Sequence, residues 1–200
     1  MAKANWVKVN PSSGSGNVNV NVSSIAEHTG RVARTTILTW KAANVANIER
    51  TVSQAGKPEY VDVADAASAD KAGKVVTISG VSNSKKLTFT LGTGDLTITL
   101  PSSYTANSVS TSNGANISGD PGAVAEYNFS ISITVPANTS TTAKTRQIIV
   151  TDEGGHQDVC LLTSAAGDAY VTVAEGVIEL DYQGTAVTVE VKSNTSWTIE

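Results

Sequence analysis

Apolar and polar residues alternate along much of this chain, and a period of two is typical of β-strands. Valines alternate with asparagines in residues 16–22, and Phe and Ile alternate with Ser in residues 129–133. Successive side chains of a strand point to opposite faces of its sheet, so each such run has one apolar face and one polar face. The pattern predicts antiparallel sheets that are covered by a partner sheet on the apolar face.

Helical periodicity is nearly absent from the 200 residues. Residues 42–46 and 64–71 have room for a turn or two of helix, and no longer helix is expected. Pro101 and Pro136 directly follow strand runs, where a missing N–H donor ends a hydrogen-bond ladder. Residues 107–122 are rich in Ser, Asn and Gly, and they predict a long exposed loop.

An internal repeat becomes visible when similar segments are aligned. The matching pairs are 59–63 with 169–173, 52–56 with 162–167, and 29–37 with 142–149. In each repeat the segments stand in the same order, so one unit closes just before the next one opens. The repeat predicts unit boundaries near Lys57 and Asp168.

These boundaries divide the chain into a half, a whole and a half. Residues 58–167 predict one complete immunoglobulin-like sandwich, of the usual size of roughly 100 residues. Residues 1–57 are interpreted as the C-terminal half of such a module and residues 168–200 as the N-terminal half. The expected fold class is all-β, with tandem immunoglobulin-like antiparallel β-sandwich modules. The predicted inner face of the middle module comprises Phe89, Leu91, Ile98, Phe129, Ile131, Ile133 and Ile149.

Four short motifs carry a resemblance to a known family. Residues 184–197 contain Thr-Val-Glu-Val-Lys-Ser-Asn-Thr-Ser-Trp, and residues 6–16 read Trp-Val-Lys-Val-Asn-Pro-Ser-Ser-Gly-Ser-Gly. Residues 31–37 hold an arginine strand and residues 52–56 end in Gln-Ala-Gly. This set resembles the BACON modules, which are immunoglobulin-like domains of gut Bacteroidetes and of their crAss-like bacteriophages. The middle unit lacks the Trp–Pro–Ser–Ser–Gly stretch, so the resemblance lies in the two terminal halves.

The resemblance implies a non-enzymatic structural protein of a bacteriophage virion, as a capsid decoration protein or a head-fibre component. The implied partners are other capsid or fibre subunits, and loops facing outward would contact host or mucus glycans. The alternative is a carbohydrate-binding accessory module of a secreted or surface protein of Bacteroidetes, with an extracellular or cell-surface location. The start at Met1 leads directly into strand-like sequence without an apolar signal segment. That start favours the virion, assembled in the host cytoplasm.

Composition excludes two classes of partner. The net charge is −4, and the only basic clusters, at 31–34 and 85–86, are short. Nucleic-acid binding needs clustered Lys and Arg, so no nucleic-acid partner is expected. No run of apolar residues approaches the length of a membrane span, so no membrane partner is expected either.

Catalytic, metal and cofactor sites are not expected. The single cysteine, Cys160, lies in an apolar run and predicts a buried, unreactive thiol. His28 and His156 lie in polar, turn-like segments and predict surface histidines without a paired nucleophile. Carboxylates gather at residues 152–158 and 62–70, but neither cluster has the spacing of a known calcium loop, and solvated turns are expected.

Three aromatic residues are candidates for glycan contact: Trp40, Tyr104 and Tyr127. Each flanks a predicted loop, where an exposed ring can stack on a sugar. A core position at the edge of a sheet is the competing interpretation for Trp40, because it ends the strand run 36–40.

The two unfinished halves raise the question of what completes them. An incomplete sandwich exposes strand edges and an apolar face, which proteins seldom leave open. Three arrangements satisfy the sequence: closure within one chain, complementation between copies, or completion by another protein or by further sequence. Complementation between chains is the preferred expectation, and it predicts a homo-oligomer.

Overall fold

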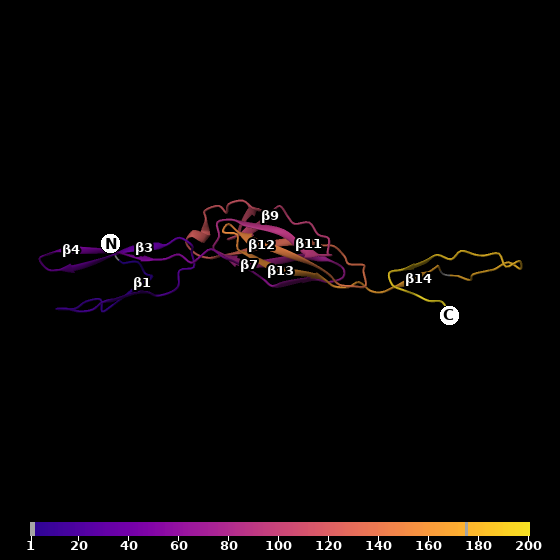
Figure 1. Ribbon diagram of the computed structural model, residues 1–200, viewed down its shortest axis with the longest axis horizontal. Helices are drawn as coiled ribbons and strands as arrows, with labels where there is room; N and C mark the ends of the chain where they lie inside the picture. Colours follow the sequence, from indigo (N-terminus) through magenta and orange to yellow (C-terminus); the bar gives the residue numbers. More distant parts are fainter. Residues whose placement is uncertain (1–2, 175) are drawn as a thin grey trace.

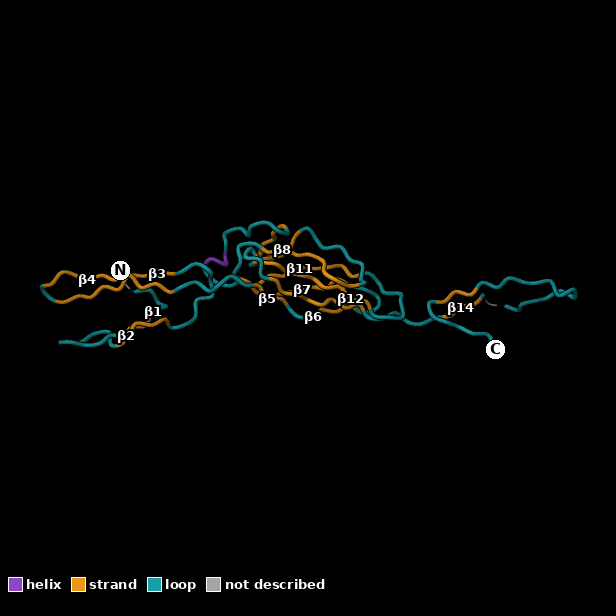
Figure 2. Tube along the Cα trace, viewed as in Figure 1, coloured by secondary structure: helices purple, strands orange, loops and turns teal. Residues whose placement is uncertain are grey.

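The computed structural model describes residues 3–174 and 176–200, and it is almost entirely β-structure. The strands are β1 (Val7–Asn10), β2 (Asn21–Ser24), β3 (Arg34–Ala42), β4 (Val45–Gln54), β5 (Val61–Val63), β6 (Ala66–Ala69), β7 (Lys74–Ser82), β8 (Leu87–Gly94), β9 (Ser103–Ala106), β10 (Val109–Ser112), β11 (Tyr127–Val135), β12 (Lys144–Asp152), β13 (Gln157–Ser164), β14 (Val171–Val173) and β15 (Val191–Ser193). Among the described residues the one helical element is the 3-10 turn η1 (Pro121–Ala123). The all-β fold class is therefore confirmed (Figure 2).

The chain forms three parts in a row along its longest axis (Figure 1). Strands β1 to β4 form two hairpins at one end, here called the N-terminal hairpin pair (residues 3–57). Strands β5 to β13 form the central sandwich (residues 58–167). Strands β14 and β15 form the C-terminal hairpin (residues 168–200) at the opposite end.

The central sandwich consists of two sheets. One has five strands in the order β10-β9-β11-β7-β5, and the other has four strands in the order β6-β13-β12-β8. All of these strand pairs are antiparallel except β6 with β13, which run parallel. Side chains from both sheets form one core, in which Phe89 meets Phe129 edge-on at 5.9 Å between ring centroids.

Strand β11 shows why the alternating runs fold in this way. Phe129, Ile131 and Ile133 are buried, while Ser132 and Thr134 between and beyond them are exposed. A slip of one residue against β7 would expose every apolar side chain of the strand, so the pattern also fixes the register.

The predicted inner face was wrong at two of its seven positions. Leu91 is 41% exposed, because the β8–β12 ladder shifts at an irregularity beside it. Ile149 points away from the core, and its neighbours Ile148 and Val150 are fully buried instead. The run Ile148-Ile149-Val150 is apolar throughout, so alternation alone does not select its inner face.

Two predicted local structures also differ. Residues 107–122 are not one exposed loop, since they contain β10 and the buried side chain of Ile117. Asn107 and Ser108 join β9 to β10 with positive φ angles of 46° and 65°, as expected of the tight turns that suit β-hairpins. Residues 64–71 include strand β6 instead of a helical turn.

The two outer parts repeat pieces of the central sandwich in the same register. Arg34 pairs with Gln54 in β3–β4, and Lys144 and Ser164, each 110 positions later, pair in β12–β13. The C-terminal hairpin repeats β5 and the end of β7 in the same way, as the pairs Val171–Ser193 and Val61–Ser82 show. Residues at matching positions of two units are called counterparts below.

The core of the central sandwich predicts the effect of a buried charge. Ile131→Asp would place a carboxylate at a position that is 1% exposed, without a partner. We expect a loss of at least about 4 kcal/mol in the free energy of unfolding, which a domain of this size rarely survives. Chemical unfolding followed by circular dichroism measures it. Thr134→Asp, on the exposed face of the same strand, is the control and should stay within about 1 kcal/mol of wild type.

Candidate functional site

The tyrosines predicted to contact glycans lie in the core. Tyr104 is 3% exposed and Tyr127 is 4% exposed. The Tyr127 hydroxyl donates to the backbone oxygen of Ser84 at 2.8 Å, and burial raises the pKa of both phenols. Their rings are therefore not available to a glycan, and both were wrong as surface candidates. Proximity to a loop did not reveal that their rings point inward.

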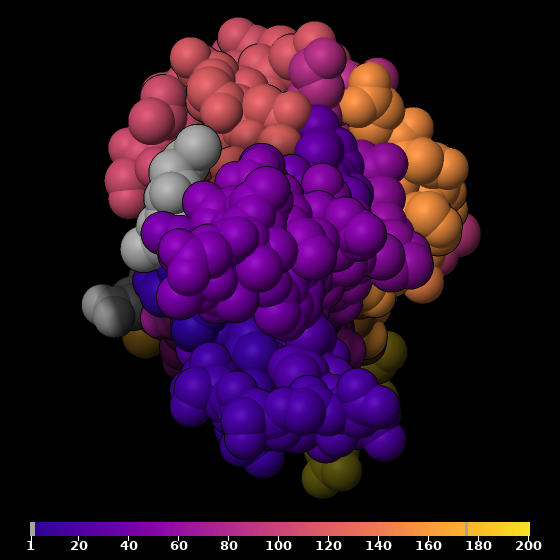
Figure 3. All heavy atoms as spheres, turned by 90° about the vertical axis from the view of Figure 1, so that its left-hand side faces the viewer, coloured from indigo at the N-terminus to yellow at the C-terminus, as the bar shows by residue number. Residues whose placement is uncertain are grey.

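Trp40 is the candidate that reaches the surface. It is 41% exposed in β3 and lines a cleft of about 540 Å³ between the two N-terminal hairpins. Figure 3 is viewed onto this end of the molecule, with both hairpins facing the reader. The lining combines apolar, hydroxyl and lysine side chains: Lys3, Val9, Pro11, Ser12, Ser13, Gly14, Val18, Val20, Leu38, Thr39, Trp40 and Lys41. This cleft is of mixed apolar and polar character, and no acidic side chain lines it to form an acid–base pair.

The two histidines have structural contacts. His28 is 8% exposed, contrary to the prediction of a surface residue, and its Nε2 lies 2.6 Å from the backbone oxygen of Val32. His156 is exposed, and its Nδ1 lies 2.8 Å from a carboxylate oxygen of Asp152. Asp152 also accepts a hydrogen bond from the His156 backbone N–H, so the pair closes the turn between β12 and β13. The His156 ring makes no hydrogen bond to a Ser, Thr or Cys side chain of the described residues.

The thiol of Cys160 is fully buried, as predicted. Burial raises its pKa to about 11, and the nearby carboxylates of Asp65 and Asp158 act in the same direction. A thiol with that pKa carries almost no thiolate at neutral pH, and the thiolate is the reactive form.

In the described part of the chain, no group of three or more His, Cys, Asp or Glu side chains is placed to hold an ion. Two of the carboxylates singled out from the sequence bond to backbone instead. Asp158 accepts from the Val63 N–H at 2.7 Å, and Asp70 accepts from the Ala72 N–H at 3.0 Å.

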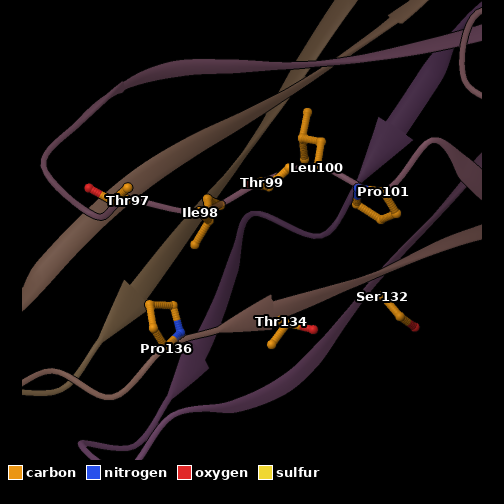
Figure 4. Close-up of a pocket in the computed structure, with 8 residues that line it drawn as sticks. All are labelled: Thr97, Ile98, Thr99, Leu100, Pro101, Ser132, Thr134 and Pro136. Atoms are coloured by element: carbon orange, nitrogen blue, oxygen red, sulfur yellow. The ribbon is translucent and has the colours of Figure 1, made fainter.

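A second, shallower pocket of about 480 Å³ lies on the central sandwich. Figure 4 shows residues 97–101 on one side of it and Ser132, Thr134 and Pro136, at the end of β11, on the other. All of these side chains are apolar or hydroxyl-bearing, so the pocket holds no group that titrates near neutral pH.

The most constrained polar site is the junction between the N-terminal hairpin pair and the central sandwich. Asn83 follows β7 and is fully buried. Its side-chain amide lies 3.2–3.3 Å from three backbone oxygens, those of Thr29, Lys57 and Pro58. Its side-chain oxygen accepts from the Tyr60 N–H at 3.0 Å. One side chain therefore ties both segments of one unit to the first strand of the next.

Backbone contacts and an ion pair reinforce this junction. The N–H groups of Arg31 and Val32 donate to the oxygens of Gly122 and Ala123. The Arg31 guanidinium makes two hydrogen bonds to the Asp120 carboxylate, one of them 2.6 Å long. The backbones of the two units approach so closely that a Cβ atom on Gly30 would lie 2.3 Å from the backbone carbonyl carbon of Val124.

The junction to the C-terminal hairpin repeats this arrangement. Asn194, which follows β15, donates to the oxygens of Thr139 and Asp168 at 2.9 Å each and accepts from the Tyr170 N–H at 3.0 Å. Ser82 and Ser193 also match, because each hydroxyl donates to the backbone oxygen of the tyrosine in its own unit. These residues are counterparts, 110 or 111 positions apart.

The sequence carried a signal for this site that the sequence analysis missed. Ser82-Asn83-Ser84 and Ser193-Asn194-Thr195 both end a strand run and share the same spacing from a preceding tyrosine to within one residue. A polar triplet of this kind is ordinarily interpreted as a turn, and only its recurrence marks it as a junction.

Comparisons with known proteins give no assignment. No protein-family model matches the chain, and no curated protein matches its sequence. Among the described residues, no helix is long and apolar enough to cross a membrane. The resemblance to BACON modules therefore stays a prediction from the motifs.

The junction predicts a large effect from an isosteric change. Asn83→Asp removes the two N–H donors and turns a carboxylate toward three carbonyl oxygens. We expect a loss of more than about 3 kcal/mol in unfolding free energy, because the buried charge would face three carbonyl oxygens with the Tyr60 N–H as its donor. Small-angle X-ray scattering should also show a wider distribution of interdomain angles. Asn128→Asp, at an exposed position of β11, is the matched control and should leave both measurements unchanged.

The Arg31–Asp120 pair predicts a pH dependence. The Arg31 guanidinium lowers the pKa of the Asp120 carboxyl below its ordinary value of 3.8. A group with a lowered pKa stabilises the folded state fully above its ordinary value and loses that contribution as the pH falls through the lowered one. We expect Asp120→Asn to reduce unfolding free energy by about 1 kcal/mol at pH 7, and the difference to vanish in acid below the lowered pKa. A difference that persists there would show that the charge is not its source.

Proposed function

We propose that this protein is a non-enzymatic structural component of a bacteriophage virion, built from immunoglobulin-like modules in a row. In the particle it serves as a capsid decoration protein or as part of a head fibre. The repeated asparagine junction is the observation that supports the proposal most strongly. A side chain that ties three backbone segments together favours a fixed angle between units, which suits a spacer or a fibre and is not needed by two independently acting domains.

The arrangement of the chain supports the same role. Its three parts follow one another along a single axis (Figure 1), so most of the surface faces outward from a line of modules. The polar faces of the strands carry mainly Ser, Thr and Asn, which keep a sheet soluble without a strong field of one sign. The proposal that the protein belongs to a phage particle rests on the resemblance of its motifs to BACON modules of crAss-like phages, since a fold alone does not determine a function.

The test is the composition of particles. Quantitative mass spectrometry of gradient-purified phage should find this chain in a constant ratio to the major capsid protein, in every band that carries infectivity. Antibody labelling in electron micrographs should then place it on the head or on its fibres. An abundant protein of the host cytosol is the control for contamination, and its ratio should fall with each purification step.

The contrary outcome would be recovery in the secreted or surface fraction of a bacterium and not in particles. That outcome would favour the alternative, a glycan-binding accessory module, for which the exposed ring of Trp40 in its cleft is the one supporting observation. In that case a glycan array should show binding that Trp40→Ala removes.

A further inference from the structure

The central sandwich shows which strand positions the N-terminal hairpin pair leaves unfilled. Within the described residues, β12 has neighbours on both edges, β13 and β8, whereas its counterpart β3 pairs only with β4. Strand β11 likewise lies between β9 and β7, whereas β2 pairs only with β1. The hairpin pair therefore has one free strand edge in each of its two small sheets, where the central sandwich has β8 and β7.

The C-terminal hairpin holds the strands that fit these positions. Strands β14 and β15 pair in the register of β5 with the end of β7. Trp197 and Ile199 alternate with polar residues after β15. They correspond to Leu87 and Phe89, which alternate in the same way at the start of β8, after β7. Residues 168–200 thus supply counterparts of β5, β7 and the start of β8, and residues 3–57 supply counterparts of β11, β12 and β13.

Several apolar side chains of both parts are exposed where their counterparts are buried, although Leu38 is buried like its counterpart Ile148. Val173 is 48% exposed, whereas its counterpart Val63 is 2% exposed. Trp40 is 41% exposed, whereas its counterpart Val150 is fully buried. In the central sandwich the facing sheet covers these positions. Each outer part therefore has an apolar sheet face that is partly uncovered.

The charges of the two parts are opposite. Residues 1–57 contain seven Lys or Arg and two Glu, whereas residues 168–200 contain six Asp or Glu and a single Lys. The central residues 58–167 separate a basic part from an acidic one. Opposite charge on two surfaces speeds their encounter and disfavours contact between two like surfaces.

We propose that copies of this protein assemble head to tail, the C-terminal hairpin of one copy completing the sandwich begun by the N-terminal hairpin pair of the next. Residues 186–189 of the first copy match 75–78 of β7 and take their place beside β2, and β15 follows beside residues 17–19. Residues 196–200 pair with the free edge of β3. Trp197 and Ile199 then enter the cleft lined by Leu38 and Trp40. Strand addition of this kind gains main-chain hydrogen bonds for affinity and side-chain pockets for specificity.

A second copy fits this role better than the same chain does. The two parts lie at opposite ends of the long axis with the central sandwich between them (Figure 1), so within one copy they do not meet. A contact between the C-terminal hairpin of one copy and the N-terminal hairpin pair of another leaves one of each free, so further copies can add to form an open chain or a ring. The assembly does not depend on a place in a virion, so particle composition and self-association test separate proposals.

Two variants that block opposite ends provide the test. Trp40→Asp places a charge in the cleft of the N-terminal hairpin pair. Val173→Asp places one on the apolar side of the C-terminal hairpin. Sedimentation velocity of the 200-residue wild type should show a mass that rises with concentration and falls as salt is raised from roughly 50 mM to 1 M. Each variant alone should stay a monomer at concentrations where the wild type forms dimers and larger species.

The decisive measurement is a mixture of the two variants. Each variant retains one intact end, so an equimolar mixture should form a one-to-one dimer and no larger species. Two misfolded variants would not form this dimer. Val75→Asp, at a 61% exposed position on the outer face of β7, is the matched control and should assemble like wild type. A mixture without dimers, or a wild type that is monomeric at all concentrations with slow amide exchange in residues 5–22, would overturn the proposal.

Discussion

Two unit boundaries of this chain depend on one side-chain amide each. At both boundaries backbone oxygens from separate segments come together, and at the first one, where Asn83 is fully buried, each needs a donor from the protein. Asn83 meets that need with its two N–H donors and also accepts from Tyr60. Aspartate lacks the donors, and the longer side chain of glutamine would not fit the same fully buried position. Beside Thr29, the backbone at Gly30 also approaches that of Val124 closely.

Because the junction is made of hydrogen bonds to backbone, it places few demands on the residues it links. Thr29, Lys57 and Pro58 at one boundary correspond to Thr139, Gly167 and Asp168 at the other, and only the threonine is shared. A repeat can thus diverge in sequence while its geometry persists. The central sandwich lacks the Trp–Pro–Ser–Ser–Gly stretch of the first unit, yet it takes part in both junctions, with the Asn83 side chain in one and the Thr139 backbone oxygen in the other.

Alternation in the sequence predicted the strands and most of the core, because β11 can bury Phe129, Ile131 and Ile133 in only one register. It failed where the pattern was ambiguous, as in Ile148-Ile149-Val150. It also failed for Tyr104 and Tyr127, because a position next to a loop does not show whether a ring points into the core or to the surface. Neither His28 nor Asn83 was recognised as buried, because a polar residue in a turn-like segment is ordinarily solvated. Asn83 bonds to backbone of segments distant in the chain, which local sequence does not reveal.

The rigid junctions and the open strand edges constrain one another. If a sandwich is completed across two copies, its junctions to the sandwiches on either side are the ones already present within each chain, at Asn194 of one copy and Asn83 of the next. The angle between units would then be set by the same contacts along the whole assembly, whether or not the backbone is continuous. A flexible junction would let such a row bend at every unit, whereas a fixed one makes the exchanged strands part of a single stiff filament.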